Sequence, residues 1–146
     1  MAPTSSTQSQ LIRTPTVAGM FYPSNPKELE ASVKYYLTEA AAKFEPAAKS
    51  APKAIIAPHA GYVYSGLTAA AVYNRLAPAR DIIKRVVILG PCHRVAVNGL
   101  ALPSTEVFAT PLGEVPLDMD GVASIVALAQ VEIFNDTHIE DHSLEV

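Results

Sequence analysis

Two short hydrophobic runs share one pattern, in which a β-branched apolar stretch ends in a proline and a histidine follows. The first is Lys53-Ala-Ile-Ile-Ala-Pro-His59, and the second is Arg85-Val-Val-Ile-Leu-Gly-Pro-Cys-His93. Continuous Ile, Val and Leu runs that are joined by a helical segment are typical of buried parallel strands. Parallel neighbours end at the same edge of a sheet, where open α/β sheets bind ligands. The pattern therefore predicts that the two histidines share a crevice.

Helix-period patterns lie on both sides of the first run. Asn25 is the predicted N-cap of one helix, with Pro26 at its first position. The apolar face of this helix is formed by Leu29, Val33, Leu37 and Ala40. Ser65 is the predicted N-cap of a second helix, which ends before Pro78 and crosses between the two runs. Its apolar positions are Leu67, Ala70, Ala71 and Leu76.

Shorter elements are expected beyond the second run. Prolines in segments 99–103 and 114–117 favour short edge strands, because proline has no N–H for a sheet ladder. Asp118 is the predicted N-cap of a further helix. Together these patterns predict an α/β fold with a mostly parallel sheet flanked by helices.

The composition predicts one domain behind a short tail. Residues 1–14 are rich in Ser, Thr, Gln and Pro and are expected to be a disordered tail, whereas residues 15–146 are expected to form one α/β domain. Of all 146 residues, 49% are hydrophobic, which is enough for a core. The chain shows neither an apolar run of transmembrane length nor a secretory signal pattern, so we expect a cytoplasmic protein that is not bound to a membrane.

Charge and motifs narrow the classes of partner. The net charge of -3 gives no electrostatic reason to expect nucleic acid or an anionic membrane. The sequence holds no phosphate-binding Gly-rich fingerprint and no basic patch with interleaved aromatic residues, which argues against a nucleotide cofactor and direct nucleic-acid binding. The expected partner is a small molecule or a peptide.

The chemistry of the two run-end histidines points to a metal. Imidazole binds divalent Fe, Cu, Zn or Ni, and two histidines with one anionic ligand leave coordination positions open. A lone histidine beside an apolar run is more often an ordinary core or loop residue. Two histidines at matched strand ends reverse that balance, so His59 and His93 are the candidate metal ligands.

Three neighbouring residues each carry two open interpretations. Tyr62 and Tyr64 follow the first histidine, where a phenol either hydrogen-bonds a substrate oxygen or packs with its hydroxyl satisfied. Cys92 is either a small buried thiol or a nucleophile with His59 as its base, which would make the protein a thiol hydrolase.

The last segment, residues 135–146, is the densest polar cluster. His138 and His142 have the spacing of zinc hydrolase helices, but glutamate is missing at the positions those helices require. The loop-like residues before His138 predict that it is exposed and that only His142 approaches the pocket. Asp141 and Glu145 either orient imidazoles or cap the next helix, and both interpretations stay open.

Five motifs occur in one order along the chain. They are Arg13-x-Pro15-x-Val17-Ala-Gly-Met-Phe-Tyr-Pro23, Ala57-Pro-His59-Ala-Gly-Tyr62 with Tyr64-Ser-Gly66, Leu89-Gly-Pro91-x-His93, Thr110-Pro-Leu112-Gly, and Asp141-His-Ser-Leu-Glu145. In these motifs the chain resembles the Memo family, which includes the AmmeMemoRadiSam system protein B. The resemblance implies a fold similar to class III extradiol dioxygenases, with His59 and His93 as metal ligands and a third ligand in a C-terminal half.

The resemblance also implies that the chain is the N-terminal part of such a domain, a fragment that is expected to be inactive and poorly soluble alone. Fe or Cu is the expected metal, with Zn as the alternative, and radical-SAM proteins are the partners that the family suggests. Two function classes remain open. One is a non-haem, metal-dependent, oxidoreductase-like protein of unknown substrate, and the other is a noncatalytic module that binds a metal or a peptide.

Overall fold

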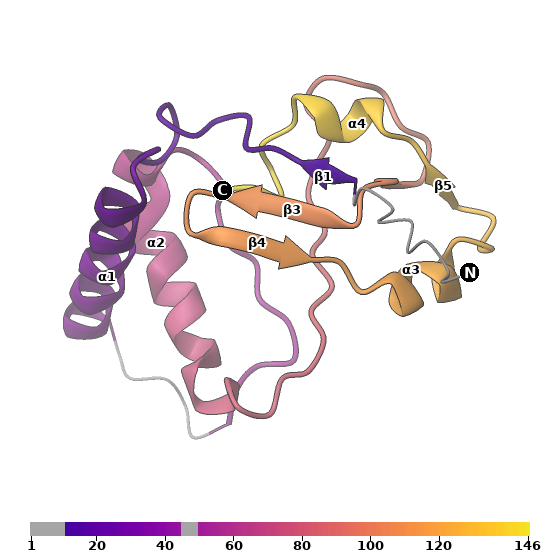
Figure 1. The fold of residues 1–146 in the computed structure, drawn as a ribbon. Coiled ribbons are helices and arrows are strands. Elements are labelled where there is room, and N and C mark those ends of the chain that lie inside the picture. Colours follow the sequence, from indigo (N-terminus) through magenta and orange to yellow (C-terminus); the bar gives the residue numbers. More distant parts are fainter. Residues whose placement is uncertain (1–10, 45–49) are drawn as a thin grey trace, which may run out of the picture.

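The computed structural model describes residues 11–44 and 50–146 and shows small sheets flanked by helices (Figure 1). The strands are β1 (Ile12–Arg13), β2 (Leu100–Leu102), β3 (Val107–Thr110), β4 (Gly113–Pro116) and β5 (Val131–Ile133). The helices are α1 (Pro26–Lys43), α2 (Tyr62–Tyr73), a 3-10 segment η1 (Asn74–Ala79), α3 (Met119–Ile125) and α4 (Asp136–Ile139). No helix in these two ranges is both long enough and apolar enough to span a bilayer.

Helices α1 and α2 pack side by side (Figure 1). The predicted cap of α1 is confirmed, because the Asn25 side chain accepts hydrogen bonds from the N–H groups of Lys27 and Glu28. A Cβ added to Gly66 of α2 would lie only 2.9 Å from the Tyr36 ring of α1. Glycine at this position therefore allows the two helices to approach closely.

The start of α2 differs from the prediction. The helix begins at Tyr62 rather than after Ser65, because the N–H groups of Tyr64 and Ser65 already donate to the carbonyl of Gly61. The Ser65 hydroxyl donates to the carbonyl of Ala60 instead of accepting from the backbone of the first turn. Serine is thus inside the helix, and its predicted role as N-cap is wrong.

The sheets confirm the α/β class but are small and mixed. The order of the larger sheet is β1-β3-β4, with β1 parallel to β3 and β3 antiparallel to β4, whereas β2 and β5 form a separate parallel pair. Asp118 caps α3 as predicted, through a hydrogen bond from the N–H of Gly121. Strand β1 falls within the expected tail: Arg13 is buried there, while residues 1–10 lie outside the described part of the chain.

The two apolar runs are not strands, which corrects the first prediction. Residues 54–59 and 83–92 belong to neither a helix nor a strand. Many of their side chains are exposed, with Ile56 95% and Val87 79% exposed. Within the described ranges, no strand lies beside either run to complete a ladder. Hydrophobic patterning identifies a segment that is suited to a sheet, but a strand forms only where a second strand pairs with it.

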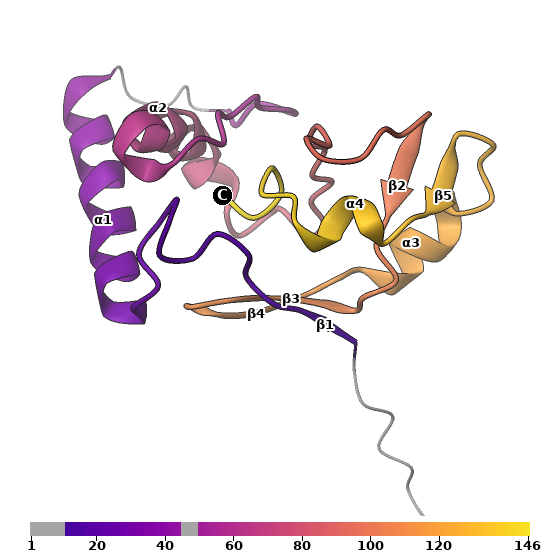
Figure 2. The ribbon, with the colours of Figure 1, turned by 90° about the horizontal axis from the view of Figure 1, so that it is seen from above.

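A small core joins the N-terminal segment to the helices. Val17, Tyr22 and Leu29 are buried together. Partly buried apolar residues pack around them, namely Ala18, Phe21, Val33, Tyr62 and Val146. Figure 2 shows the α1–α2 pair at one end, β2 and β5 at the other, and the C-terminal segment passing between them. The last residues of the chain therefore lie next to the first motif.

Candidate metal centre

Three imidazoles converge where the two runs end. One ring nitrogen from each of His59, His93 and His142 lies within 4.8 Å of the other two. The Nε2 atoms of His59 and His93 are 3.4 Å apart. The prediction that these two histidines share one place is confirmed, although extended loops rather than paired strands carry them.

The donor set fits a divalent transition metal. Two nitrogens that bind one metal at about 2.0–2.1 Å with tetrahedral geometry lie roughly 3.4 Å apart. The separation between His59 Nε2 and His93 Nε2 has this value. Imidazole nitrogens suit Zn, Cu, Fe and Ni, and three protein donors leave coordination positions open for another ligand. The three residues together could therefore hold a metal ion.

Asp141 orients the His93 ring. Its Oδ2 atom accepts a hydrogen bond of 2.7 Å from the His93 backbone N–H and lies 3.1 Å from His93 Nδ1. A proton on Nδ1 satisfies this contact and leaves the Nε2 lone pair directed at His59. Of the two roles left open for Asp141, the geometry favours the one that orients an imidazole.

The Asp141 side chain is held in its charged form. Burial alone raises the pKa of this carboxyl group, but hydrogen bonds from the backbone N–H groups of His93 and Ser143 and from their side chains oppose burial and hold the pKa well below its ordinary value. Asp141 is therefore a carboxylate at neutral pH. A carboxylate behind a ring N–H makes the opposite nitrogen a better metal donor.

His142 stacks on His93 and completes the cluster. The two rings are 4.4 Å apart between centroids with an interplanar angle of 18°, and Phe21 lies against His142 at 4.5 Å. Burial and the nearby His93 lower the pKa of His142, which favours the neutral, metal-binding form. Sequence reasoning placed His142 near the pocket but not among the donors. The sequence signal for His142 as a donor was Asp141 immediately before it, because one turn can place both a metal-binding imidazole and a carboxylate that orients another imidazole at the same site.

Glu145 joins the C-terminal segment to the first motif instead of orienting an imidazole. Its side chain is 2% exposed and pairs with that of Arg13, which is 8% exposed, at 2.9 Å. The carboxylate also accepts hydrogen bonds from the N–H groups of Thr16 and Val17 and from the Tyr22 hydroxyl. Burial raises the pKa of Glu145, but these hydrogen bonds outweigh it and lower the pKa to about 2. Burial and Glu145 in turn raise the pKa of Tyr22.

Arg13 fixes the backbone that carries the donors. Its Nε donates to the carbonyl of His138 at 2.7 Å, and its Nη2 donates to the carbonyl of Asp141 at 2.6 Å. We call the Arg13–Glu145 pair and these hydrogen bonds the clasp. The clasp contacts the chain before this turn, at His138, and after it, at Glu145. It therefore fixes the position of the turn that carries Asp141 and His142.

An open cleft of about 860 Å³ adjoins His59 and His142. Its apolar lining includes Met20, Phe21, Ile56, Pro58 and Val63. Tyr64 is 87% exposed and also lines this cleft. Tyr62 instead packs against the rings of Tyr22 and Tyr36, and burial raises its pKa. The packed interpretation therefore describes Tyr62, while Tyr64 is the phenol beside the cluster.

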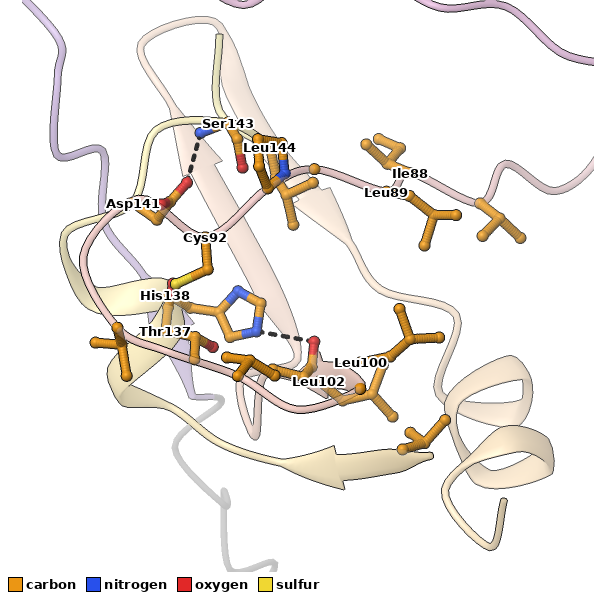
Figure 3. Close-up of a pocket in the computed structure, with 18 of the residues that line it drawn as sticks. Ile88, Leu89, Cys92, Leu100, Leu102, Thr137, His138, Asp141, Ser143 and Leu144 are labelled. Carbon is orange, nitrogen blue, oxygen red and sulfur yellow. Dashed lines mark hydrogen bonds between the residues drawn. The ribbon is translucent and has the colours of Figure 1, made fainter. Parts of the chain in front are cut away.

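Cys92 and His138 line a different cavity, of about 540 Å³, shown in Figure 3. The Cys92 thiol is half-buried, its Sγ lies 3.9 Å from the carbonyl of Thr137, and His59 does not line this cavity. His138 Nε2 lies 3.2 Å from the carbonyl of Ala101, and burial lowers the pKa of this ring. The predicted exposure of His138 is wrong, because α4 turns the ring inward against β2 and Phe108.

Comparison with known proteins shows a matching protein family and several relatives of similar sequence. A family model described as Memo-like protein matches residues 13–146. A MEMO1 family protein of Archaeoglobus fulgidus is 41% identical over 140 residues, which cover 92% of this chain and 47% of the relative. A MEMO1 family protein of Aquifex aeolicus is 38% identical over 135 residues, with coverage of 92% and 47%. Protein MEMO1 of Danio rerio is 36% identical over 130 residues, covering 88% of this chain but 41% of the relative. The chain thus spans about half the length of these relatives.

Proposed function

We propose that this chain, which belongs to the Memo family, supplies a three-histidine site in a non-haem, metal-dependent, oxidoreductase-like protein. The observation that carries the proposal is the convergence of His59, His93 and His142, whose ring nitrogens lie within 4.8 Å of one another. Fe or Cu is the proposed metal, and the same donors suit Zn. A class III extradiol dioxygenase-like fold and association with radical-SAM proteins belong to this proposal on the family resemblance alone.

Different residues of the chain would bind the metal, orient its ligands and contact a substrate. A bound divalent ion would supply Lewis-acid or redox chemistry beside the cleft. Asp141 holds the His93 ring with its proton on Nδ1, and Phe21 covers one side of His142. The cleft next to His59 offers apolar contacts and the Tyr64 side chain, so it would receive an apolar group of a substrate. The identity of that substrate is not part of the proposal.

A noncatalytic module is the second candidate, and the width of the cleft favours it. Ile56 and Tyr64 are 95% and 87% exposed, so this surface is open enough for a peptide side chain to reach the imidazoles. In that case the metal or the histidines would bind a partner without turnover. Oxygen consumption by the metal-loaded protein separates the two candidates, since only an oxidoreductase consumes oxygen with substrate.

Metal titration of the intact chain tests the shared part of both candidates. Fe(II), Cu(II) and Zn(II) are titrated separately, Fe(II) under anaerobic conditions, and bound metal is counted by mass spectrometry. We expect one ion per chain, and His59→Ala, His93→Ala or His142→Ala to lower its affinity at least ~10-fold. His138→Ala is the matched control, because this imidazole is half-buried but lies outside the cluster. Equal losses in all four variants, or no stoichiometric binding by the unmodified chain, would contradict the proposal.

A further inference from the structure

We infer that Arg13 is a positioning residue of the candidate metal centre, because its guanidinium group fixes the peptide unit that joins Asp141 to His142. The consequence of this role, a change in the affinity and geometry of a bound metal, rests on the proposed function. The orientation of the two side chains is a property of the chain itself and can be measured without metal. Arg13 acts through the backbone and is not a metal ligand, since a guanidinium group has only donors.

The guanidinium group of Arg13 is anchored before it reaches the C-terminal segment. Arg13 pairs with Phe108 in the parallel β1–β3 ladder, and its guanidinium carbon lies 4.9 Å from the centroid of the Phe108 ring. Its Nη1 atom pairs with Glu145 Oε2 at 2.9 Å, and only 8% of the Arg13 side chain is exposed. An aromatic ring and a carboxylate thus hold the cation. Arg13 therefore presents its other N–H groups from a fixed place.

One of these N–H groups controls the peptide unit between Asp141 and His142. Nη2 donates to the Asp141 carbonyl at 2.6 Å, while Nε donates to the His138 carbonyl at 2.7 Å. A peptide unit is planar, so the direction of the Asp141 carbonyl also fixes the direction of the His142 N–H. The Asp141 side chain leaves one end of this unit, and the His142 side chain leaves the other. A single hydrogen bond therefore sets both side chains relative to the guanidinium group.

Both side chains belong to the candidate metal centre. Asp141 Oδ2 lies 3.1 Å from His93 Nδ1 and orients that donor, whereas His142 is itself a donor. The His142 ring rests on the rings of His93 and Phe21 at centroid distances of 4.4 and 4.5 Å. Ring contacts are less directional than hydrogen bonds, and a working site needs its groups within about 0.5 Å of the productive geometry. The backbone that Arg13 holds therefore decides how these donors meet.

This role requires the shape of arginine as well as its charge. The guanidinium group is a planar fork with donors in fixed positions, whereas lysine ends in one ammonium group on a flexible stem. Arg13→Lys keeps a cation beside Glu145, but one ammonium group cannot keep the spacing between the carbonyls of His138 and Asp141. This variant therefore separates positioning from charge.

Tyr22→Phe is the matched control, because it weakens the same network without touching Arg13. The Tyr22 hydroxyl donates to Glu145 Oε1 at 2.6 Å, whereas Arg13 pairs with Oε2. Oε1 keeps the N–H groups of Thr16 and Val17 in this variant. We expect both variants to unfold at lower urea concentration than the unmodified chain, but only Arg13→Lys to move the imidazoles.

The first measurement uses the intact chain in EDTA, so that metal plays no part. NMR records nuclear Overhauser contacts from the His142 ring to the rings of Phe21 and His93. We expect these contacts in the unmodified chain and in Tyr22→Phe, and their loss in Arg13→Lys. Circular dichroism checks that each variant is folded.

Copper binding measures the consequence for the metal. Cu(II) affinity is determined by competition with a chelator, and the geometry of the bound ion by electron paramagnetic resonance. We expect Arg13→Lys to lower the affinity about 10-fold and to change the spectrum, while Tyr22→Phe leaves both unchanged. A merely structural role would lower the urea midpoint without altering the spectrum of the bound ion.

The unmodified chain offers a further measurement that needs no variant. Binding free energies are reciprocal, so an ion that binds better when Arg13 holds this turn must in return strengthen the hydrogen bonds of Arg13. The Arg13 Nε–H proton, which bonds the His138 carbonyl, should therefore exchange with water more slowly after Cu(II) is added. An unchanged exchange rate in the copper-bound chain would overturn the inference.

Two results with the variants would also overturn it. One is an Arg13→Lys variant that keeps the ring contacts and the unmodified copper spectrum. The other is a Tyr22→Phe variant that loses the ring contacts to the same extent, because the effect would then follow stability alone. If the unmodified chain binds neither Fe(II), Cu(II) nor Zn(II), the proposed function fails, whereas the ring contacts in EDTA still support or overturn the inference.

Discussion

The clasp and the open runs, as we call residues 54–58 and 85–89, support the same three imidazoles in opposite ways. The clasp buries Arg13 and Glu145. Arg13 donates hydrogen bonds to backbone carbonyls of the C-terminal segment, and Glu145 accepts hydrogen bonds from the N-terminal segment. The open runs lead into His59 and His93 on backbone outside any helix or strand, and most of their large apolar side chains are exposed. Buried charged side chains that hydrogen-bond to nearby backbone can order a loop, whereas a β-strand forms only when another strand pairs with it. The turn that carries His142 is therefore fixed by buried polar contacts, whereas the two runs have no backbone pairing among the described residues.

The largest effect should come from breaking the clasp. Glu145→Gln leaves the buried Arg13 guanidinium without its charged partner, so we expect the free energy of unfolding to fall by about 3 kcal/mol or more. Urea denaturation followed by circular dichroism measures the loss. Glu30→Gln, which removes an exposed pair with Lys34, is the control and should leave the urea midpoint unchanged. If both variants lose the same stability, the clasp contributes no more than an exposed ion pair.

Acid should weaken the clasp next, because protonation removes only the charge-dependent part of its stability. The pKa of Glu145 is lowered from its ordinary value of 4.5 to about 2. A carboxyl group with a lowered folded pKa stabilises the fold above its unfolded pKa, and that stability disappears as the pH falls toward the folded pKa. We expect the urea midpoint to fall between pH 4.5 and about 2. The Glu145→Gln variant should show a flatter profile over this range, and a parallel profile would contradict the assignment.

The smallest of the three effects should come at the junction of the two regions. Asp141 belongs to the turn that the clasp holds, yet it orients His93 at the end of an open run. Asp141→Asn keeps the shape but weakens the contact to Nδ1, so we expect metal affinity to fall about 10–100-fold. Competition with a chromophoric chelator measures it. Asp120→Asn, on α3, is the control, and equal affinity in both variants would remove Asp141 from its orienting role.

Predictions that rest on neighbouring residues agree best with the structure. Asn25 and Asp118 cap their helices as predicted, because a cap joins groups two or three residues apart. The error at Ser65 is also local. The hydroxyl could accept a hydrogen bond from the first turn of the helix or donate one to a preceding carbonyl, and the sequence pattern does not distinguish these two contacts. Helix class and approximate position could thus be read from the sequence.

Predictions that depend on distant partners agree less well. The meeting of His59 and His93 is confirmed, but the paired strands that motivated it are missing, because periodicity does not say whether a partner strand is present. Arg13 lay in the expected tail, and its partner Glu145 is 132 residues away. A buried ion pair leaves no periodic signal at either end. The clasp therefore could not be predicted from composition or spacing.

That separation also has a consequence for how the protein is made. Synthesis runs from the N-terminus at about 5–20 residues per second, so Arg13 is made roughly 7 to 26 seconds before Glu145, from which it is separated by 132 residues. During that interval, α1 and α2 can form and pack on each other, because the Asn25 cap of α1 and the packing partners of both helices are already present. The turn that carries His142 is translated after both apolar runs and cannot be fixed before Glu145 is made. In a growing chain, the three imidazoles can therefore come together only after that turn has been synthesised.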